Sequence, residues 1–131
     1  MATFVRAGAA LPAKDFERAK SWYADKLGLK PVQEMGDQGS YYEVGDSRFM
    51  LYPSQFAGTN QATAMGLEVD DVEATVAELR SAGVEFAEYD FPGLKTVDGV
   101  ATMEADGHTL KSAWCTDSEG NIIAIANAWR D

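Results

Sequence analysis

The feature that most constrains the fold is an internal repeat. The segment Asp15-Phe16-Glu17 recurs as Asp71-Val72-Glu73, an offset of 71 − 15 = 56 residues, and Leu27-Gly28-Leu29 recurs as Ala82-Gly83-Val84, an offset of 83 − 28 = 55 residues. Each copy therefore holds a possible helix start and a possible helix stop at matching places. A repeat of this length constrains the architecture more strongly than any single motif does.

Each copy of the repeat predicts one helix. In the first copy Asp15 is a suitable N-cap, apolar residues recur at helical spacing over 16–27, and Gly28 supplies the C-terminal stop. In the second copy either of two consecutive aspartates, Asp70 or Asp71, can cap a helix that ends at an equivalent glycine.

Short apolar runs between turn signals predict the strands around these helices, at 3–11, 29–35, 40–44, 48–52, 62–69, 84–89, 99–105, 109–116 and 121–128. The sequence thus predicts one domain over 1–131, with βαβββ modules at about 3–60 and 61–131. A single module would leave one face of a small sheet uncovered. We therefore expect an α+β fold in which two curved mixed sheets surround a cleft, and a cleft is the natural place for a ligand.

Composition excludes several classes of partner. The 131 residues carry 21 acidic and 11 basic side chains, a formal net charge of −10, which repels nucleic-acid phosphates and anionic lipid surfaces. Cys115 is the only cysteine, so no disulfide forms within the chain, and no run of about 18 apolar residues occurs. We expect a cytoplasmic protein with no nucleic-acid partner and no membrane partner.

Three segments carry a resemblance to a known family. They are ALPAKDFERAKSWYADKLGL at 10–29, GLEVDDVEATVAELRSAGV at 66–84 and TDSEGNIIAI at 116–125, in this order. Together they resemble the vicinal oxygen chelate superfamily, which includes glyoxalase I, extradiol dioxygenases, fosfomycin-resistance enzymes and bleomycin-resistance binding proteins. The resemblance implies the fold predicted above, whereas the activity stays open because the superfamily supports many chemistries on one scaffold.

The resemblance also marks the places where metal-dependent members hold their ion. The first ligand position falls on Gly8, its counterpart in the second half on Ala64, and the position in the final strand on Ala124. The fourth lies somewhere on 48–54, a strand without Asp, Glu or His. Glycine and alanine side chains have no donor atoms for a divalent transition ion. We therefore expect no metal and no other cofactor.

Small side chains at these positions widen the predicted pocket and make it less polar, which favours an apolar or aromatic guest. Arg6 shares the strand face of Gly8 by alternation and could meet an anionic group there, although a solvated strand end is the more ordinary role for it. The candidate ligand-binding residues are Arg6, Gly8, Tyr42, Phe49, Leu51, Tyr52, Ala64, Trp114 and Ala124. Because side chains alternate along a strand, only about half of the aromatic candidates can face inward, and we favour Tyr52 and Trp114.

The leading hypothesis is a metal-independent small-molecule binding protein of the bleomycin-resistance-like type. It would sequester an aromatic or cationic metabolite or antibiotic, and the resemblance implies a homodimer. One rival is a metal-free isomerase, epimerase or lyase that uses a carboxylate or a tyrosine such as Tyr42 or Tyr52 as acid or base. Another is an auxiliary subunit. The sequence assigns no catalytic residue and leaves open whether the protein is an enzyme.

Overall fold

The computed structural model describes residues 1–127. The chain divides into two compact units. The first unit comprises Met1–Asn60 together with Ser118–Asn121, and the second comprises Gln61–Asp117 and the chain from Ile122 onward. The turn at Ser118–Asn121 therefore belongs to the first unit, although the strands on either side of it belong to the second.

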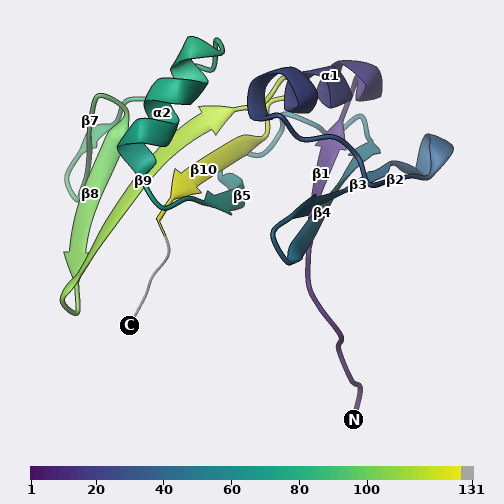
Figure 1. Ribbon diagram of the computed structural model, residues 1–131, viewed down its shortest axis with the longest axis horizontal. Helices are drawn as coiled ribbons and strands as arrows, with labels where there is room; N and C mark the ends of the chain where they lie inside the picture. The colour runs from purple at the N-terminus through teal and green to yellow at the C-terminus, as the bar shows by residue number, and fades with distance from the viewer. Residues whose placement is uncertain (128–131) are drawn as a thin grey trace. The chain divides into compact units, whose positions relative to one another are not determined.

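The first unit is a βαβββ module (Figure 1). Its sheet has the strand order β1-β4-β3-β2, in which β1 runs parallel to β4 and the other pairs are antiparallel. Its elements are β1 (Ala9–Ala13), α1 (Phe16–Leu27), β2 (Gln33–Glu34), the 3-10 helix η1 (Gly36–Gln38), β3 (Ser40–Val44) and β4 (Ser47–Pro53).

The second unit repeats this topology and extends it. Its sheet has the order β5-β10-β9-β8-β7-β6, and its first strand, β5, again runs parallel to its last strand, β10. Its elements are β5 (Thr63–Glu68), α2 (Val72–Ser81), β6 (Asp90–Phe91), β7 (Leu94–Val97), β8 (Val100–Ala105), β9 (His108–Thr116) and β10 (Ile122–Ala126). The predicted α+β class with two βαβββ modules is confirmed.

Both helices begin and end where the repeat predicts. The carboxylate of Asp15 accepts the backbone N–H of Arg18 at 3.0 Å, and that of Asp71, rather than Asp70, accepts the N–H of Ala74 at 3.0 Å. Gly28 ends α1 with a left-handed φ of 69°, which glycine adopts without the steric cost that a Cβ would add.

Each sheet has one face covered by its helix. In the first unit the buried side chains of β3 and β4 pack against Ala19 and Tyr23 of α1, and the rings of Tyr42 and Phe49 stack with centroids 4.8 Å apart. In the second unit the covered face holds the cluster of Val72, Val76, Val100 and Ala113. We call the opposite side of each sheet its helix-free face.

Several predicted strands are shorter in the structure. The strand predicted at 3–11 begins only at Ala9, which pairs with Phe49 of β4. The strand predicted at 29–35 is reduced to Gln33–Glu34, and the one predicted at 84–89 is reduced to a single bridge between Phe86 and Cys115.

The final strand, predicted at 121–128, ends at Ala126, and residue 128 lies outside the described residues. The hairpin of β6 and β7 was not predicted at all. In residues 1–127 the structure has no helix long and apolar enough to cross a membrane.

Candidate functional site

The registers of the two sheets identify equivalent positions on their helix-free faces. In the first sheet Met50 pairs with both Ala10 and Tyr41, and in the second Ala124 pairs with both Gly66 and Trp114. Gly66 follows Ala10 by 66 − 10 = 56 residues, the same offset that separates the two helix caps. The row Ala10, Met50, Tyr41 therefore corresponds to the row Gly66, Ala124, Trp114.

This correspondence locates the fourth position that the sequence placed only within 48–54. Because Met50 occupies the place in β4 that Ala124 occupies in β10, the four positions are Gly8, Met50, Ala64 and Ala124. None of them carries an imidazole or a carboxylate, and a methionine thioether is a ligand for soft metals such as Cu(I). Within residues 1–127 no three His, Cys, Asp or Glu side chains converge as metal ligands would. These residues do not fit the divalent ion of the metal-dependent relatives.

The helix-free face of the first unit contains a cavity of about 480 Å³. Its volume lies within the range of roughly 300 to 1,000 Å³ that is usual for small-molecule sites. It brings together the predicted residues Arg6, Gly8 and Phe49. The full lining is Arg6, Ala7, Gly8, Ala9, Ala10, Gln33, Tyr41, Arg48, Phe49 and Met50.

Gly8 owes its place in this cavity to a close approach between two backbone segments. A Cβ at position 8 would lie 2.8 Å from the carbonyl oxygen of Arg48, nearer than real Cβ contacts come. Gly8 is exposed and lies just before β1, which begins at Ala9. The strand predicted at 3–11 therefore includes neither Gly8 nor Arg6 in the structure. A side chain at the first ligand position would therefore require the backbone at Arg48 or Gly8 to shift.

The helix-free face of the second unit carries an aromatic group beside small residues. The rings of Tyr89 and Trp114 meet edge to face with centroids 5.6 Å apart, and Phe91 lies 5.7 Å from Tyr89. Trp114 pairs across the sheet with Ala124. Ala64 lies two residues before Gly66 along β5, at an irregularity of the register where Ile122 pairs with Thr63 and Ile123 with Met65, so strand alternation does not fix its face. The half-buried ring of Trp114 therefore lies beside a part of the sheet surface where the side chains are small.

Three of the predicted ligand-binding residues are almost fully buried in the core, and of these only Phe49 also borders the cavity. Tyr42, Phe49 and Leu51 are 0%, 3% and 0% exposed and lie on the face that α1 covers. Because side chains alternate along a strand, the helix-free face of β3 and β4 presents Tyr41 and Met50. Tyr52, one of the two favoured aromatic residues, alternates with Leu51 and lies on that face, half-buried.

Neither Tyr42 nor Cys115 ionises readily at neutral pH. Burial, followed by the charges of Glu34 and Glu17, raises the pKa of Tyr42 to about 12. Burial, followed by the charge of Asp117, raises the pKa of Cys115 to about 11. Both groups therefore keep their protons, and Tyr42 is a poor general base while Cys115 is a poor nucleophile.

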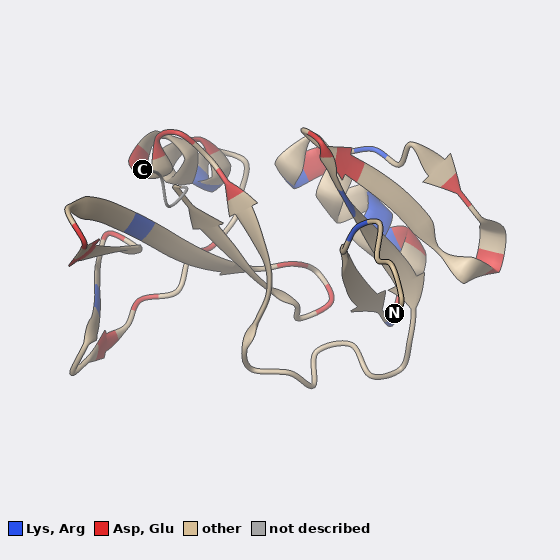
Figure 2. Cartoon of the chain, turned by 90° about the horizontal axis from the view of Figure 1, so that it is seen from below, with Lys and Arg blue, Asp and Glu red and all other residues tan. Residues whose placement is uncertain are grey.

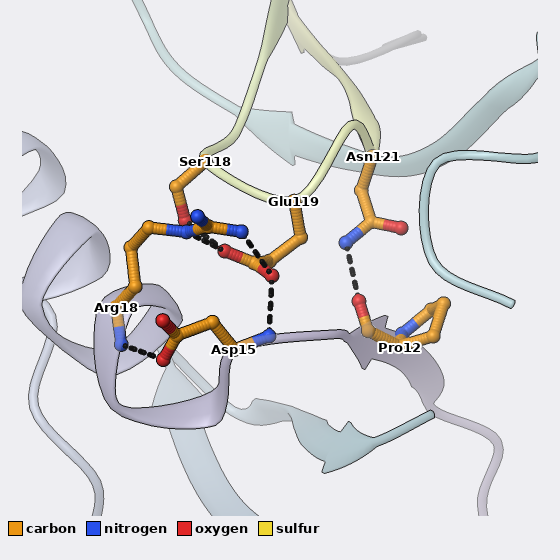
Figure 3. Close-up of polar contacts among 6 residues, drawn as sticks. All are labelled: Pro12, Asp15, Arg18, Ser118, Glu119 and Asn121. Atoms are coloured by element: carbon orange, nitrogen blue, oxygen red, sulfur yellow. Dashed lines mark hydrogen bonds and ion pairs between the residues drawn. The ribbon is translucent and has the colours of Figure 1, made fainter. Parts of the chain in front are cut away.

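Sequence reasoning missed the buried carboxylate of Glu119 (Figure 3). Its side chain is fully buried and forms a two-pronged ion pair with Arg18, with N–O distances of 2.8 and 3.1 Å. It also accepts the backbone N–H of Asp15 at 2.8 Å and the hydroxyl of Ser118 at 2.7 Å. Burial alone would raise the pKa of Glu119, but these donors lower it to about 2.

The same turn is fixed at a second point. The side-chain amide of Asn121 donates to the carbonyl oxygen of Pro12 at 2.9 Å (Figure 3). The segment 116–125, which carries part of the family resemblance, therefore anchors the turn at Ser118–Asn121 to the end of β1 and the start of α1. Its role in these contacts is structural.

Comparison with known proteins agrees with this geometry. The family model described as Glyoxalase/Bleomycin resistance protein/Dioxygenase superfamily matches residues 6–125. No curated protein sequence gives a significant match.

Solved structures with this fold include proteins with several roles. A virulence protein from Salmonella typhimurium is 16% identical, with a TM-score of 0.70 over 98% of this chain and 100% of the other. A bleomycin resistance determinant encoded on the transposon Tn5 is 17% identical, with a TM-score of 0.67 over 97% and 100%. A lactoylglutathione lyase from Agrobacterium tumefaciens is 18% identical, with a TM-score of 0.65 over 95% and 93%. At these identities the similarity establishes the fold alone.

Proposed function

Because the chain belongs to the glyoxalase/bleomycin resistance protein/dioxygenase superfamily, we propose that it binds a small molecule without a metal ion and sequesters it. The observation that carries the proposal is the set of residues at the four ligand positions, Gly8, Met50, Ala64 and Ala124. A protein that only binds needs no Lewis acid, so this set suits sequestration better than the metal-dependent chemistry of the family. No step of the proposed function passes through a metal.

The second unit supports an aromatic ligand. Tryptophan is the largest aromatic side chain, and beside Trp114 the small residues Ala124 and Gly66 leave room for a flat ring to lie over the sheet. In the first unit Tyr41 occupies the equivalent position beside Met50, whose thioether makes favourable contacts with aromatic rings. We propose these residues, with Arg6, Gly8, Tyr52 and Ala64, as ligand contacts.

The charge of the chain supports a cationic ligand. Acidic positions outnumber basic ones by 21 to 11, and both units display them along their strands and turns (Figure 2). A field of this sign raises the local concentration of cations near the protein. We therefore propose a planar aromatic cation, as a metabolite or an antibiotic, for the ligand, and a homodimer in the cytoplasm for the functional state.

Isothermal titration with bleomycin and with a panel of planar aromatic cations tests this function. We expect saturable binding with the same affinity in EDTA as in its absence, and no new product in mass spectra of the mixture. Affinity that depends on added metal would contradict the proposal.

The same mixtures test the rival classes. Turnover in the presence of EDTA would instead establish a metal-free enzyme. Failure of the purified chain to bind any member of the panel, together with co-purification of another chain, would favour an auxiliary subunit.

A further inference from the structure

The cavity on the helix-free face of the first unit departs from the acidic character of the chain. The chain has 21 acidic and 11 basic residues, yet the cavity lining contains Arg6 and Arg48 and no aspartate or glutamate. Even when Glu43, the ion-pair partner of Arg48, is counted with the lining, the net charge is 2 − 1 = +1. A positively charged cavity in an acidic protein favours an anionic ligand.

The guanidinium of Arg48 is held in place. Its Nε and Nη2 atoms donate to the same carboxylate oxygen of Glu43, at 3.2 and 2.8 Å, and its side chain is half-buried. Because one oxygen accepts both bonds, the N–H groups of Nη1 have no partner within residues 1–127. An anion that binds these groups meets a guanidinium whose orientation is already set, which lowers the entropy cost of binding.

The register of the sheet places this guanidinium beside the apolar part of the cavity. Arg48 and Met50 lie two residues apart along β4 and therefore on the same face, and Met50 pairs with Tyr41. Side chains two residues apart on a strand are about 7 Å from each other, which is close to the span of an aromatic ring with an acidic substituent. A ligand whose ring contacts Met50 and Tyr41 thus has its acidic group next to Arg48.

Arg6 and Gln33 add hydrogen-bond donors at the border of the cavity. The guanidinium of Arg6 forms no ion pair, and the side-chain amide of Gln33 forms no hydrogen bond, with any residue of the described chain. The segment that carries Arg6 approaches the start of β4, since a Cβ at Gly8 would lie 2.8 Å from the carbonyl oxygen of Arg48. The cavity therefore offers an anion a second cation that the lining itself leaves unpaired.

We propose that this cavity binds an aromatic carboxylate. The carboxylate pairs with Arg48 and Arg6, because guanidinium groups match the planar geometry of a carboxylate, and the ring packs on Tyr41 and Met50. The inference rests on the proposed function in taking this cavity as a ligand site, and it adds the class of ligand that the first unit selects. Stacking of an aromatic cation on Trp114 in the second unit does not depend on it.

An NMR titration of the complete 15N-labelled chain tests the site. The probe is indole-3-acetate, and its matched control is indole-3-acetamide, which has the same ring and shape without the charge. We expect saturating shifts of the amide signals of Gly8, Tyr41 and Arg48, with an affinity for the carboxylate about tenfold higher than for the amide. Acetate alone should give no saturating shifts, because it has no ring. Equal affinities for the two indoles, or saturation by acetate alone, would overturn the proposal.

Variants separate a specific site from general charge attraction. Arg48→Gln should weaken binding of indole-3-acetate by about tenfold, whereas Lys30→Gln, an equal change of charge at an exposed position outside the cavity, should alter it less than about twofold. Arg48→Lys keeps the charge but not the planar fork and should recover only part of the loss. Equal losses in Arg48→Gln and Lys30→Gln would show that only net charge attracts the anion, which overturns the site.

Tryptamine, which carries the same ring on a cation, distinguishes this inference from the proposed function. Shifts at the amide of Trp114 with tryptamine, without saturation by indole-3-acetate at the first unit, would retain the proposed function and overturn the carboxylate site. Saturation by indole-3-acetate without a response to tryptamine or to the panel of aromatic cations would support the carboxylate site and contradict the proposed cationic ligand. Arg6→Gln should weaken indole-3-acetate binding by about threefold, and unchanged affinity in both arginine variants would overturn the proposal.

Discussion

The two units share one topology and differ in what they place on their helix-free faces. In the first unit the central row of Ala10, Met50 and Tyr41 borders a cavity with two guanidinium groups. In the second the equivalent row ends in Trp114, which joins an aromatic group. The caps and registers of the two units are therefore alike, whereas the side chains on their helix-free faces differ.

The units also differ in the ion pair that the first turn of each helix forms. Arg18 of α1 pairs with Glu119, whose side chain is fully buried, whereas Glu73 of α2, whose side chain is exposed, pairs at 2.6 Å with the half-buried Lys111. Breaking an ion pair that involves a buried carboxylate lowers the free energy of unfolding far more than breaking an ion pair at the surface, whose net contribution to stability is small. The following predictions test both differences.

The largest effect is expected at Glu119. Glu119→Ala removes the acceptor of Arg18, Asp15 and Ser118 and should lower the free energy of unfolding by about 2 to 3 kcal/mol. Glu73→Ala is the matched control and should cost less than about 0.5 kcal/mol. Urea denaturation of both variants measures the difference, and equal costs would show that the two pairs do not differ as described.

The lowered pKa of Glu119 also predicts that the stability of the fold depends on pH. Its pKa is about 2 in the folded chain, below its usual value of 4.5, so its ionised form is favoured by folding. This contribution is fully present above pH 4.5 and is lost as the pH falls from 4.5 towards 2. Urea midpoints measured across this window should fall less steeply in Glu119→Gln than in the unchanged chain. Parallel pH profiles would contradict the assignment.

Gly8, just before β1, and Gly66, within β5, should differ in how much a substitution by alanine changes the stability of the chain. Gly8→Ala places a Cβ 2.8 Å from the carbonyl oxygen of Arg48 and should destabilise the chain by about 1 to 2 kcal/mol. A Cβ at Gly66 meets no atom within 4 Å, and Gly66→Ala should be neutral or slightly stabilising. Thermal melting of the two variants compares them, and a stable Gly8→Ala chain would show that position 8 can carry a side chain.

The two equivalent aromatic residues should contribute unequally to binding. Trp114→Ala should weaken binding of an aromatic cation by about tenfold, equivalent to about 1.4 kcal/mol, because a stacking surface is lost. Tyr41→Ala removes a smaller ring and should weaken the same binding by about threefold. Titration calorimetry measures both affinities. A larger loss at Tyr41 would reverse the proposed roles of the two faces.

Much of the architecture was predictable from the sequence because its signals are local. Asp15, Asp71 and Gly28 mark helix ends within a few residues of the segments they cap, and the repeat offset reveals the duplication directly. The face of each strand was harder to predict. Tyr41 and Tyr42 are adjacent and chemically alike, so alternation alone does not say which one the helix covers.

Other features depend on partners far away in the sequence. Glu119 lies 101 residues from Arg18, and nothing in its turn signals that the carboxylate is buried. Tyr89 and Phe91 have the period-two spacing of a strand, but the hairpin of β6 and β7 that holds Phe91 is only two to four residues per strand. Such short strands pair without leaving a recognisable apolar pattern.

The central claim is that the family's ligand positions hold no metal and that the protein binds an organic molecule in its place. Native mass spectrometry of freshly purified protein, with elemental analysis of the same sample, tests it most directly. We predict a bound organic mass or an empty chain, unchanged by EDTA and without stoichiometric metal. One equivalent of zinc, iron, nickel or manganese, lost when Gly8, Met50, Ala64 or Ala124 is altered, would contradict the account.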